Sequence, residues 1–197
     1  MYDIDFFKKT NNLKKKITTG LLKSADTEDI SFELESLRKK SPHIYNIETT
    51  NYCNMKCVMC PRTMFMTRKN IWIDDKLFEN LITDIKIHDQ KNLENFWNWL
   101  ENDYKQTAKE VSENGFYFSI ISRHLVLHGF GEPFLDKNLI QRIELCSKKK
   151  IPTYFSCTPA TMTIEKAEKA MEAGLGVLKF SLDAMDERKI QKIRGKR

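Results

Sequence analysis

The sequence lacks a run of about 18 apolar residues, the length that a membrane-spanning helix requires. Residues 1–16 also lack the apolar stretch of a secretory signal, and they carry two early aspartates. No low-complexity segment is present, and no repeat other than an alternation of strands and helices. These absences predict a protein without a membrane partner, and the cytoplasm is the expected compartment.

Cysteine is scarce and unevenly distributed. Only five cysteines are present, an odd number, and three of them fall between positions 53 and 60. This distribution argues against a framework of disulfides and favours a reducing compartment.

Long stretches of one charge are also lacking. The formal net charge is +6, from 33 lysines and arginines against 27 acidic residues. The basic residues gather only in short clusters, at 14–16, 148–150 and 196–197. Such clusters are typical of solvated helix ends, so nucleic acid is not expected as a partner.

Residues 1–42 are predicted to form a helical N-terminal extension. Apolar residues recur at every third or fourth position in two stretches, Leu13, Ile17, Leu21 and Ile30, Leu34, Leu37. This spacing predicts two amphipathic helices, separated by a break at 24–26. We expect the second helix to end before Pro42, because the residue that precedes a proline disfavours helical backbone angles.

From residue 43 to residue 197 the pattern alternates between strand and helix. Strands are predicted at 43–49, 124–128, 153–157 and 177–183, and helices at 74–85, 137–149, 164–173 and from 186 onward. This order predicts a parallel sheet, and hence an α/β fold with about four βα units. A further helix with an aromatic face, at about 89–114, is interpreted as an insertion.

Three thiols lie on one short loop after the first predicted strand. Cys53, Cys57 and Cys60 have the spacing Cys-x3-Cys-x2-Cys. Three thiolates can hold three corners of an iron–sulfur cube and leave the fourth iron open, whereas electron-transfer clusters usually have four cysteine ligands. The alternatives are a zinc site, with His128 or Cys157 as its fourth ligand, and a redox dithiol.

Other polar residues follow the remaining predicted strands. Gly131, Glu132 and Pro133 come after the second strand, Thr158 after the third, and Asp183 ends the fourth. In parallel α/β folds, ligands bind at the carboxyl ends of the strands, where all of these residues are expected. Cys146 and Cys157 are predicted to be buried core thiols. His128 is either a hydrogen-bonded core histidine or a residue that faces the site.

Taken together, these motifs resemble the radical S-adenosylmethionine (radical SAM) superfamily over residues 43–195. The resemblance rests on the cysteine spacing, on Gly131-Glu132-Pro133, on Ser-Leu-Asp at 181–183 and on Ile-Arg-Gly at 193–195. The sequence around the third cysteine and the form of 129–133 are similar to those of members with an added SPASM or twitch domain. Those members modify peptides, proteins or small metabolites.

The resemblance implies a 4Fe–4S cluster on Cys53, Cys57 and Cys60, with S-adenosylmethionine bound at its open iron. It implies further cofactor contacts from six residues: Met59 at the adenine, Gly131, Glu132 and Pro133 at the methionine amino group, and Ser181 and Asp183 at the ribose. The implied activity is that of an oxidoreductase-like enzyme that cleaves S-adenosylmethionine reductively and then abstracts hydrogen from an unknown substrate. Its electron donor would be a protein such as flavodoxin or ferredoxin.

The family barrel has about six βα units, and the sequence contains about four. The fold is therefore expected to be an incomplete (β/α) barrel, a partial TIM barrel whose fourth strand is an open edge. We interpret the chain as the N-terminal, catalytic portion of a longer protein, or as a subunit whose edge another chain covers. The alternative is a non-catalytic remnant that binds a cluster and serves as a partner subunit.

Overall fold

The computed structural model describes residues 3–22, 27–38, 43–107 and 112–195. The predicted helix break at 24–26, the stop at Pro42 and the basic end at 196–197 lie outside these residues. The chain divides into two compact units, one from the described parts of Met1–Ile44 and His88–Ser122, the other from Tyr45–Ile87 and Arg123–Arg197. None of the helices in the described ranges is long and apolar enough to span a membrane.

The first unit consists of helices. They are α1 (Ile4–Thr18), α2 (Thr27–Ser36), α5 (Gln90–Tyr104) and α6 (Glu113–Arg123). Asp3 caps α1 by accepting a hydrogen bond from the Phe6 backbone, and Asp89 caps α5 by accepting one from Asn92. Their core is aromatic, because Phe7, Trp99 and Phe118 pack around the buried residues Ile4, Phe96 and Leu100.

One feature of this unit differs from the prediction. The single helix expected at 89–114 ends at Tyr104, where Lys105 takes a left-handed conformation with φ 55°, and α6 follows as a separate helix. Helices from the N-terminal extension and from the predicted insertion belong to this one unit. The domain boundaries at residue 42 and at 89–114 stay predictions.

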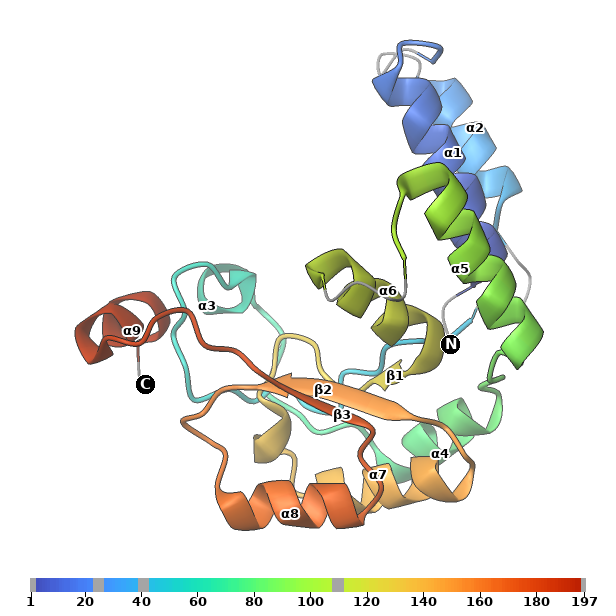
Figure 1. The fold of residues 1–197 in the computed structure, drawn as a ribbon. Helices are drawn as coiled ribbons and strands as arrows, with labels where there is room; N and C mark the ends of the chain where they lie inside the picture. Colours follow the sequence, from blue (N-terminus) through green and yellow to red (C-terminus); the bar gives the residue numbers. More distant parts are fainter. Residues whose placement is uncertain (1–2, 23–26, 39–42, 108–111, 196–197) are drawn as a thin grey trace. The chain divides into compact units, whose positions relative to one another are not determined.

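The second unit is an α/β layer with a small parallel sheet, the partial (β/α) barrel that the sequence predicts. Its strands β1 (Leu125–Val126), β2 (Thr153–Cys157) and β3 (Val177–Phe180) lie in the order β1-β2-β3, with Val126 opposite Tyr154 and Tyr154 opposite Val177. The helices are α3 (Pro61–Phe65), α4 (Asp75–Thr83), α7 (Leu139–Lys148), α8 (Ile164–Glu172) and α9 (Glu187–Arg194), with a 3-10 turn, η1, at Pro133–Leu135. Helices α4, α7 and α8 lie together on one side of the sheet (Figure 1).

The strand predicted at 43–49 does not form. Asn46 makes only an isolated parallel bridge to Val126, supported by backbone hydrogen bonds from Ile47 to Val126 and from Val126 to Tyr45, both 2.8 Å. The ladder does not continue past this bridge. The Asn46 side chain donates to the His128 carbonyl at 2.7 Å, and the Glu48 carboxylate accepts from the Phe130 backbone N–H at 2.6 Å. Beyond it, the chain turns away and Thr50 forms an antiparallel bridge to Trp72.

The core of this unit lies between the sheet and its helices. Phe78 and Ile82 from α4, Ile143 and Cys146 from α7 and Phe155 from β2 are all fully or almost fully buried. Both Cys146 and Cys157 are buried, as predicted. This packing places the turns after β1, β2 and β3 near the cysteine loop.

Candidate functional site

The cysteine loop is a tight turn that opens into α3. The Cys60 N–H donates to the Cys57 carbonyl at 3.1 Å, and the Thr63 hydroxyl donates to the same carbonyl at 3.1 Å. Pro61 then occupies the first position of α3, where a missing N–H costs nothing. Cys57 is buried, whereas Cys53 and Cys60 are half-buried, and all three are free thiols.

The C-terminal end of α9 is hydrogen-bonded to the cysteine loop. The Lys56 N–H donates to the Arg194 carbonyl at 3.0 Å, and the Val58 N–H donates to the Ile193 carbonyl at 2.9 Å. The Arg194 guanidinium also contacts the Cys57 sulfur, with 3.8 Å between Nη1 and Sγ. Ile-Arg-Gly at 193–195 belongs to the family resemblance, but the sequence alone assigns no role to Arg194.

Gly131 brings a second segment against the residues that precede Cys53. The Glu132 N–H donates to the Tyr52 carbonyl at 2.7 Å. A Cβ atom on Gly131 would lie 1.9 Å from the carbonyl oxygen of Thr50, far inside van der Waals contact. Only glycine permits this approach, so the Gly131 position follows from geometry.

Glu132 is buried and only half satisfied. Its Oε2 atom accepts hydrogen bonds from the backbone N–H of Thr158 at 2.9 Å and from its hydroxyl at 3.1 Å. Its Oε1 atom is also buried but accepts no hydrogen bond from the described residues. The Thr161 hydroxyl lies nearby but donates to the Thr158 carbonyl at 3.1 Å. Burial raises the pKa of Glu132, against the opposing effect of donors from Thr158, from the Thr161 side chain and from the Phe134 backbone.

The Cys53 thiol is within electrostatic range of three charged or titratable side chains. Burial raises the pKa of the Cys53 thiol, a hydrogen bond from the Met55 backbone and the charge of Arg62 lower it, and Glu132 and Cys57 raise it further. Arg62 is buried, with its Nε donating to the Asn51 carbonyl at 2.9 Å, and its Nη1 has no hydrogen-bond partner among the described residues. The burial of Arg62 is not predicted by its sequence context.

The other predicted contacts have different surroundings. Met59 is exposed beside the cysteines, and Pro133 is buried as the first residue of η1 rather than placed on a strand edge. The Ser181 hydroxyl shares a hydrogen bond of 2.7 Å with Ser156, and Asp183 forms an ion pair with Arg194. Strand β3 ends at Phe180, so both Ser181 and Asp183 lie beyond it.

The three thiols of the cysteine loop are the ligand type that an iron–sulfur cluster requires, but their sulfur atoms do not surround one point. Within the described ranges, no group of three or more His, Cys, Asp or Glu side chains stands ready to hold a metal ion. Shared ligation by the three thiols would therefore require their side chains to turn toward one another. The unpartnered Oε1 of Glu132 fits a cationic ligand group beside them.

His128 and Cys157, the two residues considered as a fourth zinc ligand, have surroundings that disfavour zinc binding. The Nδ1 atom of His128 accepts a hydrogen bond from the Ser156 N–H at 3.3 Å, and burial, aided by the charge of Lys179, lowers the pKa of His128 to about 4. His128 is thus a hydrogen-bonded histidine rather than an exposed ligand. Burial raises the pKa of the Cys157 thiol to about 12, which disfavours the thiolate that zinc requires.

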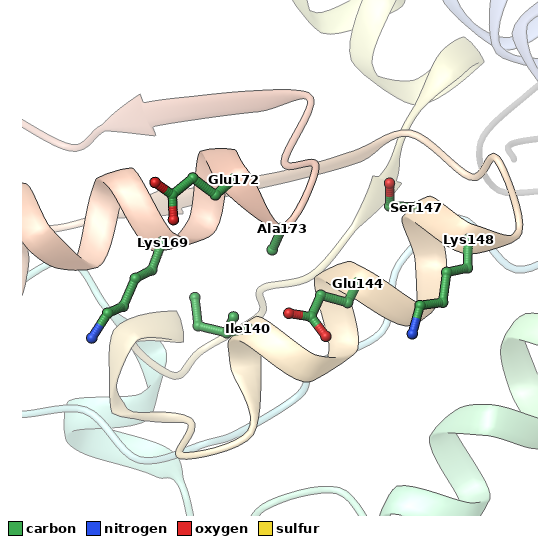
Figure 2. Close-up of a pocket in the computed structure, with 7 residues that line it drawn as sticks. All are labelled: Ile140, Glu144, Ser147, Lys148, Lys169, Glu172 and Ala173. Carbon is green, nitrogen blue, oxygen red and sulfur yellow. The ribbon is translucent and has the colours of Figure 1, made fainter.

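The pockets lined by described residues of this unit include the following two. One, of about 330 Å³, lies between α7 and α8, with Glu144 and Lys148 from α7 on one side and Lys169 and Glu172 from α8 on the other (Figure 2). None of the predicted site residues lines it. The second, of about 230 Å³, adjoins the cysteine loop and is lined by Pro61, Arg62, Phe65, Met66, Thr67, Arg68 and Phe130.

Comparison with known proteins identifies the family of the chain. The model of the radical SAM superfamily matches residues 47–197, which is most of the chain. The chain therefore belongs to the radical SAM superfamily, whose members bind a 4Fe–4S cluster and S-adenosylmethionine. The family match does not distinguish the SPASM or twitch subtype, which stays a prediction. No curated protein matches the sequence significantly.

Two solved structures are similar in fold. The crystal structure of BtrN in complex with AdoMet and 2-DOIA has a TM-score of 0.50 and 16% identity, over 79% of this chain and 52% of BtrN. The structure of TYW1 with a lysine-pyruvate adduct bound has a TM-score of 0.43 and 20% identity, over 74% of this chain and 43% of TYW1. The chain thus spans about half the length of BtrN. At 16% identity the likeness to BtrN concerns the fold alone.

Proposed function

We propose that this chain is a radical SAM enzyme, or the catalytic portion of one. Cys53, Cys57 and Cys60 would hold a 4Fe–4S cluster that, when bound, supplies the electron for reductive cleavage of S-adenosylmethionine. The chain would then start hydrogen abstraction from a substrate, such as a peptide, a protein or a small metabolite. An electron donor such as flavodoxin or ferredoxin, and the polypeptide or subunit that completes the barrel, are the proposed partners.

The observation that carries this proposal is the buried, unpartnered Oε1 of Glu132. A buried acceptor without a partner is costly unless a ligand satisfies it. The methionine ammonium group of S-adenosylmethionine has both the hydrogen-bond donors and the positive charge for this role. Because the charges of Glu132 and Cys53 interact, an ammonium held by Glu132 would lie on the same rim as the thiols.

Two further residues, Gly131 and Met59, would orient the ligand and limit its motion. The close contact between Gly131 and Thr50 keeps Glu132 at a fixed distance from the cysteine loop. The exposed Met59 side chain provides an apolar surface for the adenine. Holding the ligand in one orientation is the principal contribution that a protein makes to cofactor chemistry.

Anaerobic reconstitution with iron and sulfide tests the cluster assignment. We expect the purified chain to take up iron and sulfide, and Cys53→Ala, Cys57→Ala and Cys60→Ala each to lose most of that iron. Cys146→Ala is the matched control, since it also removes a thiol but from the core. Retention of the cluster after any of the three loop substitutions would overturn the ligand assignment.

Reduction with dithionite in the presence of S-adenosylmethionine tests the activity. Formation of 5′-deoxyadenosine and methionine supports the enzyme. A stable cluster without cleavage would instead favour the non-catalytic subunit. One feature supports that alternative. Strand β3 lies at the edge of the sheet, and Phe180 at its end and Leu182 just beyond it are exposed, so another chain could cover this edge.

A further inference from the structure

Arg194 lies between two groups of the candidate site. It is the last residue of α9, and its side chain is 15% exposed. Its Nε pairs with the Asp183 carboxylate, while its Nη1 donates toward the Cys57 sulfur at 3.8 Å, a long hydrogen bond to sulfur. The guanidinium therefore joins a carboxylate beyond β3 to the central cysteine of the loop.

The backbone holds Cys57 beside the end of α9. The residues on either side of Cys57 bond to the same end of that helix, Lys56 to Arg194 at 3.0 Å and Val58 to Ile193 at 2.9 Å. These bonds fix the backbone and leave the Cys57 thiol free to turn, so the thiol can take part in shared ligation while it stays within reach of the Arg194 side chain. Asp183 pairs with Nε, a different nitrogen from the Nη1 that contacts Cys57, and so restrains the guanidinium.

We propose that Arg194 is a positioning residue for the cluster, one that donates to the Cys57 sulfur and raises the cluster's reduction potential. This inference rests on the proposed function, because it requires Cys57 to be a ligand. Hydrogen bonds to the sulfurs of an iron–sulfur cluster and the charge around it set its potential. Gaining an electron makes the cluster more negative, so a nearby cation and hydrogen-bond donor favour the reduced form.

The same geometry gives Asp183 a role other than the expected ribose contact. Its carboxylate neutralises part of the guanidinium charge and orients the donor. The hydrogen bond to sulfur, rather than the net charge of the pair, is then the larger influence on the cluster. A lysine at position 194 has a single charged nitrogen and cannot contact both groups with the fork geometry of arginine.

The decisive measurement is a redox titration followed by electron paramagnetic resonance. The wild-type chain, Arg194→Gln, Arg194→Lys and Lys192→Gln would be reconstituted and reduced stepwise with dithionite. Lys192 is the matched control, a basic residue exposed in the last turn of α9. We expect a more negative midpoint potential for Arg194→Gln, an intermediate value for Arg194→Lys, and the wild-type value for Lys192→Gln.

A second readout is the rate at which a chelator removes iron. Loss of a group that supports a metal ligand commonly weakens metal binding by about 10- to 100-fold, so Arg194→Gln should release iron at least about tenfold faster than Lys192→Gln. Circular dichroism checks that each variant is folded. If Arg194→Gln does not fold, Arg194→Lys decides the question, since an unchanged potential in that variant overturns the inference.

The two proposals fail in different ways. If the wild-type chain takes up no cluster, the proposed function is wrong and the role of Arg194 with it. The other outcome is that the wild-type chain holds a cluster while the Arg194 variants show the same midpoint potential and the same rate of iron release as the wild type. In that case only the inference on Arg194 is overturned.

Discussion

Glu132 and Thr158 are joined by two hydrogen bonds to one carboxylate oxygen, from the Thr158 N–H at 2.9 Å and from its hydroxyl at 3.1 Å. Glu132 follows β1 and Thr158 follows β2, so the contact ties together the ends of two neighbouring strands. It also fixes the carboxylate so that the second oxygen stays buried without a partner. Under the proposed function, this arrangement would hold Glu132 in place for the ammonium group of the ligand.

Glu132→Gln should weaken binding of S-adenosylmethionine to the reconstituted protein. Hydrogen bonds to charged groups contribute about 1.5–3 kcal/mol, which corresponds to about a 10- to 100-fold rise in Kd. Isothermal titration calorimetry under anaerobic conditions measures this change. Glu165→Gln, on the exposed face of α8, is the control and should leave the Kd unchanged. An unaltered Kd for Glu132→Gln would remove the residue from the binding site.

Gly131→Ala should destabilise the second unit. The new Cβ would collide with the Thr50 backbone at 1.9 Å, and neither backbone segment can move without breaking the Glu132–Tyr52 hydrogen bond. Overpacking of this kind costs about 1–3 kcal/mol of unfolding free energy. Urea denaturation would measure it. The atoms nearest to a Cβ at Gly129 belong to the Glu48 side chain, the closest at 2.7 Å, so Gly129→Ala should cost less, because a side chain shifts more readily than a backbone carbonyl. Equal losses would contradict this account.

Arg142→Met should lower the stability of the second unit by much more than a substitution at the surface. Arg142 is buried in α7, with its Nε 2.9 Å from the buried Asp136 carboxylate and its Nη2 2.9 Å from the Ile73 carbonyl. Removing one partner of a buried ion pair leaves an uncompensated charge and costs about 3–5 kcal/mol. Thermal denaturation tests this. Lys169→Met breaks an exposed pair with Glu165 and should leave the melting temperature almost unchanged.

Stability should fall between pH 6.5 and about pH 4 because of His128. In the folded chain, burial lowers the pKa of His128 from 6.5 to about 4. As the pH falls below 6.5 the unfolded chain gains a proton that the folded chain does not, so the unfolded state is favoured. The effect has an upper bound of about 3 kcal/mol and is absent above pH 6.5.

His128→Asn provides the comparison, since its amide oxygen can still accept from the Ser156 N–H. The difference in unfolding free energy between the wild type and this variant should change by up to about 3 kcal/mol across that pH range. Urea titrations at several pH values would measure it. Parallel pH curves for the two proteins would show that His128 does not titrate in the way described.

Local patterns predicted the elements that local interactions stabilise. Strand β2 spans the predicted 153–157, and Asp74 and Asp186 cap α4 and α9, where their carboxylates accept hydrogen bonds from the Leu77 and Lys189 backbones. Capping and periodicity depend on residues within a few positions of one another. They can therefore be recognised without knowledge of the fold.

Features that depend on distant contacts were missed or mispredicted. Residues 43–49 have the composition of a strand, but the side chains of Asn46 and Glu48 bond to the backbone of residues 128 and 130 in place of a continued ladder. Arg62 has the character of a surface residue, yet the Asn51 carbonyl holds it in the interior. The motif residues Cys53, Cys57, Cys60, Gly131 and Glu132 could be named from the sequence. The support that Arg194 gives to the loop could not, since it depends on a contact with Cys57 that spans 137 positions.

The backbone contacts between α9 and the cysteine loop have a consequence for biosynthesis. The loop emerges from the ribosome early, but residues 193–195, which hold Lys56 and Val58, are made much later. Contacts of such wide sequence separation form only once both partners are available. We therefore expect iron delivery in the cell to succeed only after translation has passed residue 195, and nascent chains halted before that point to carry an unsupported loop.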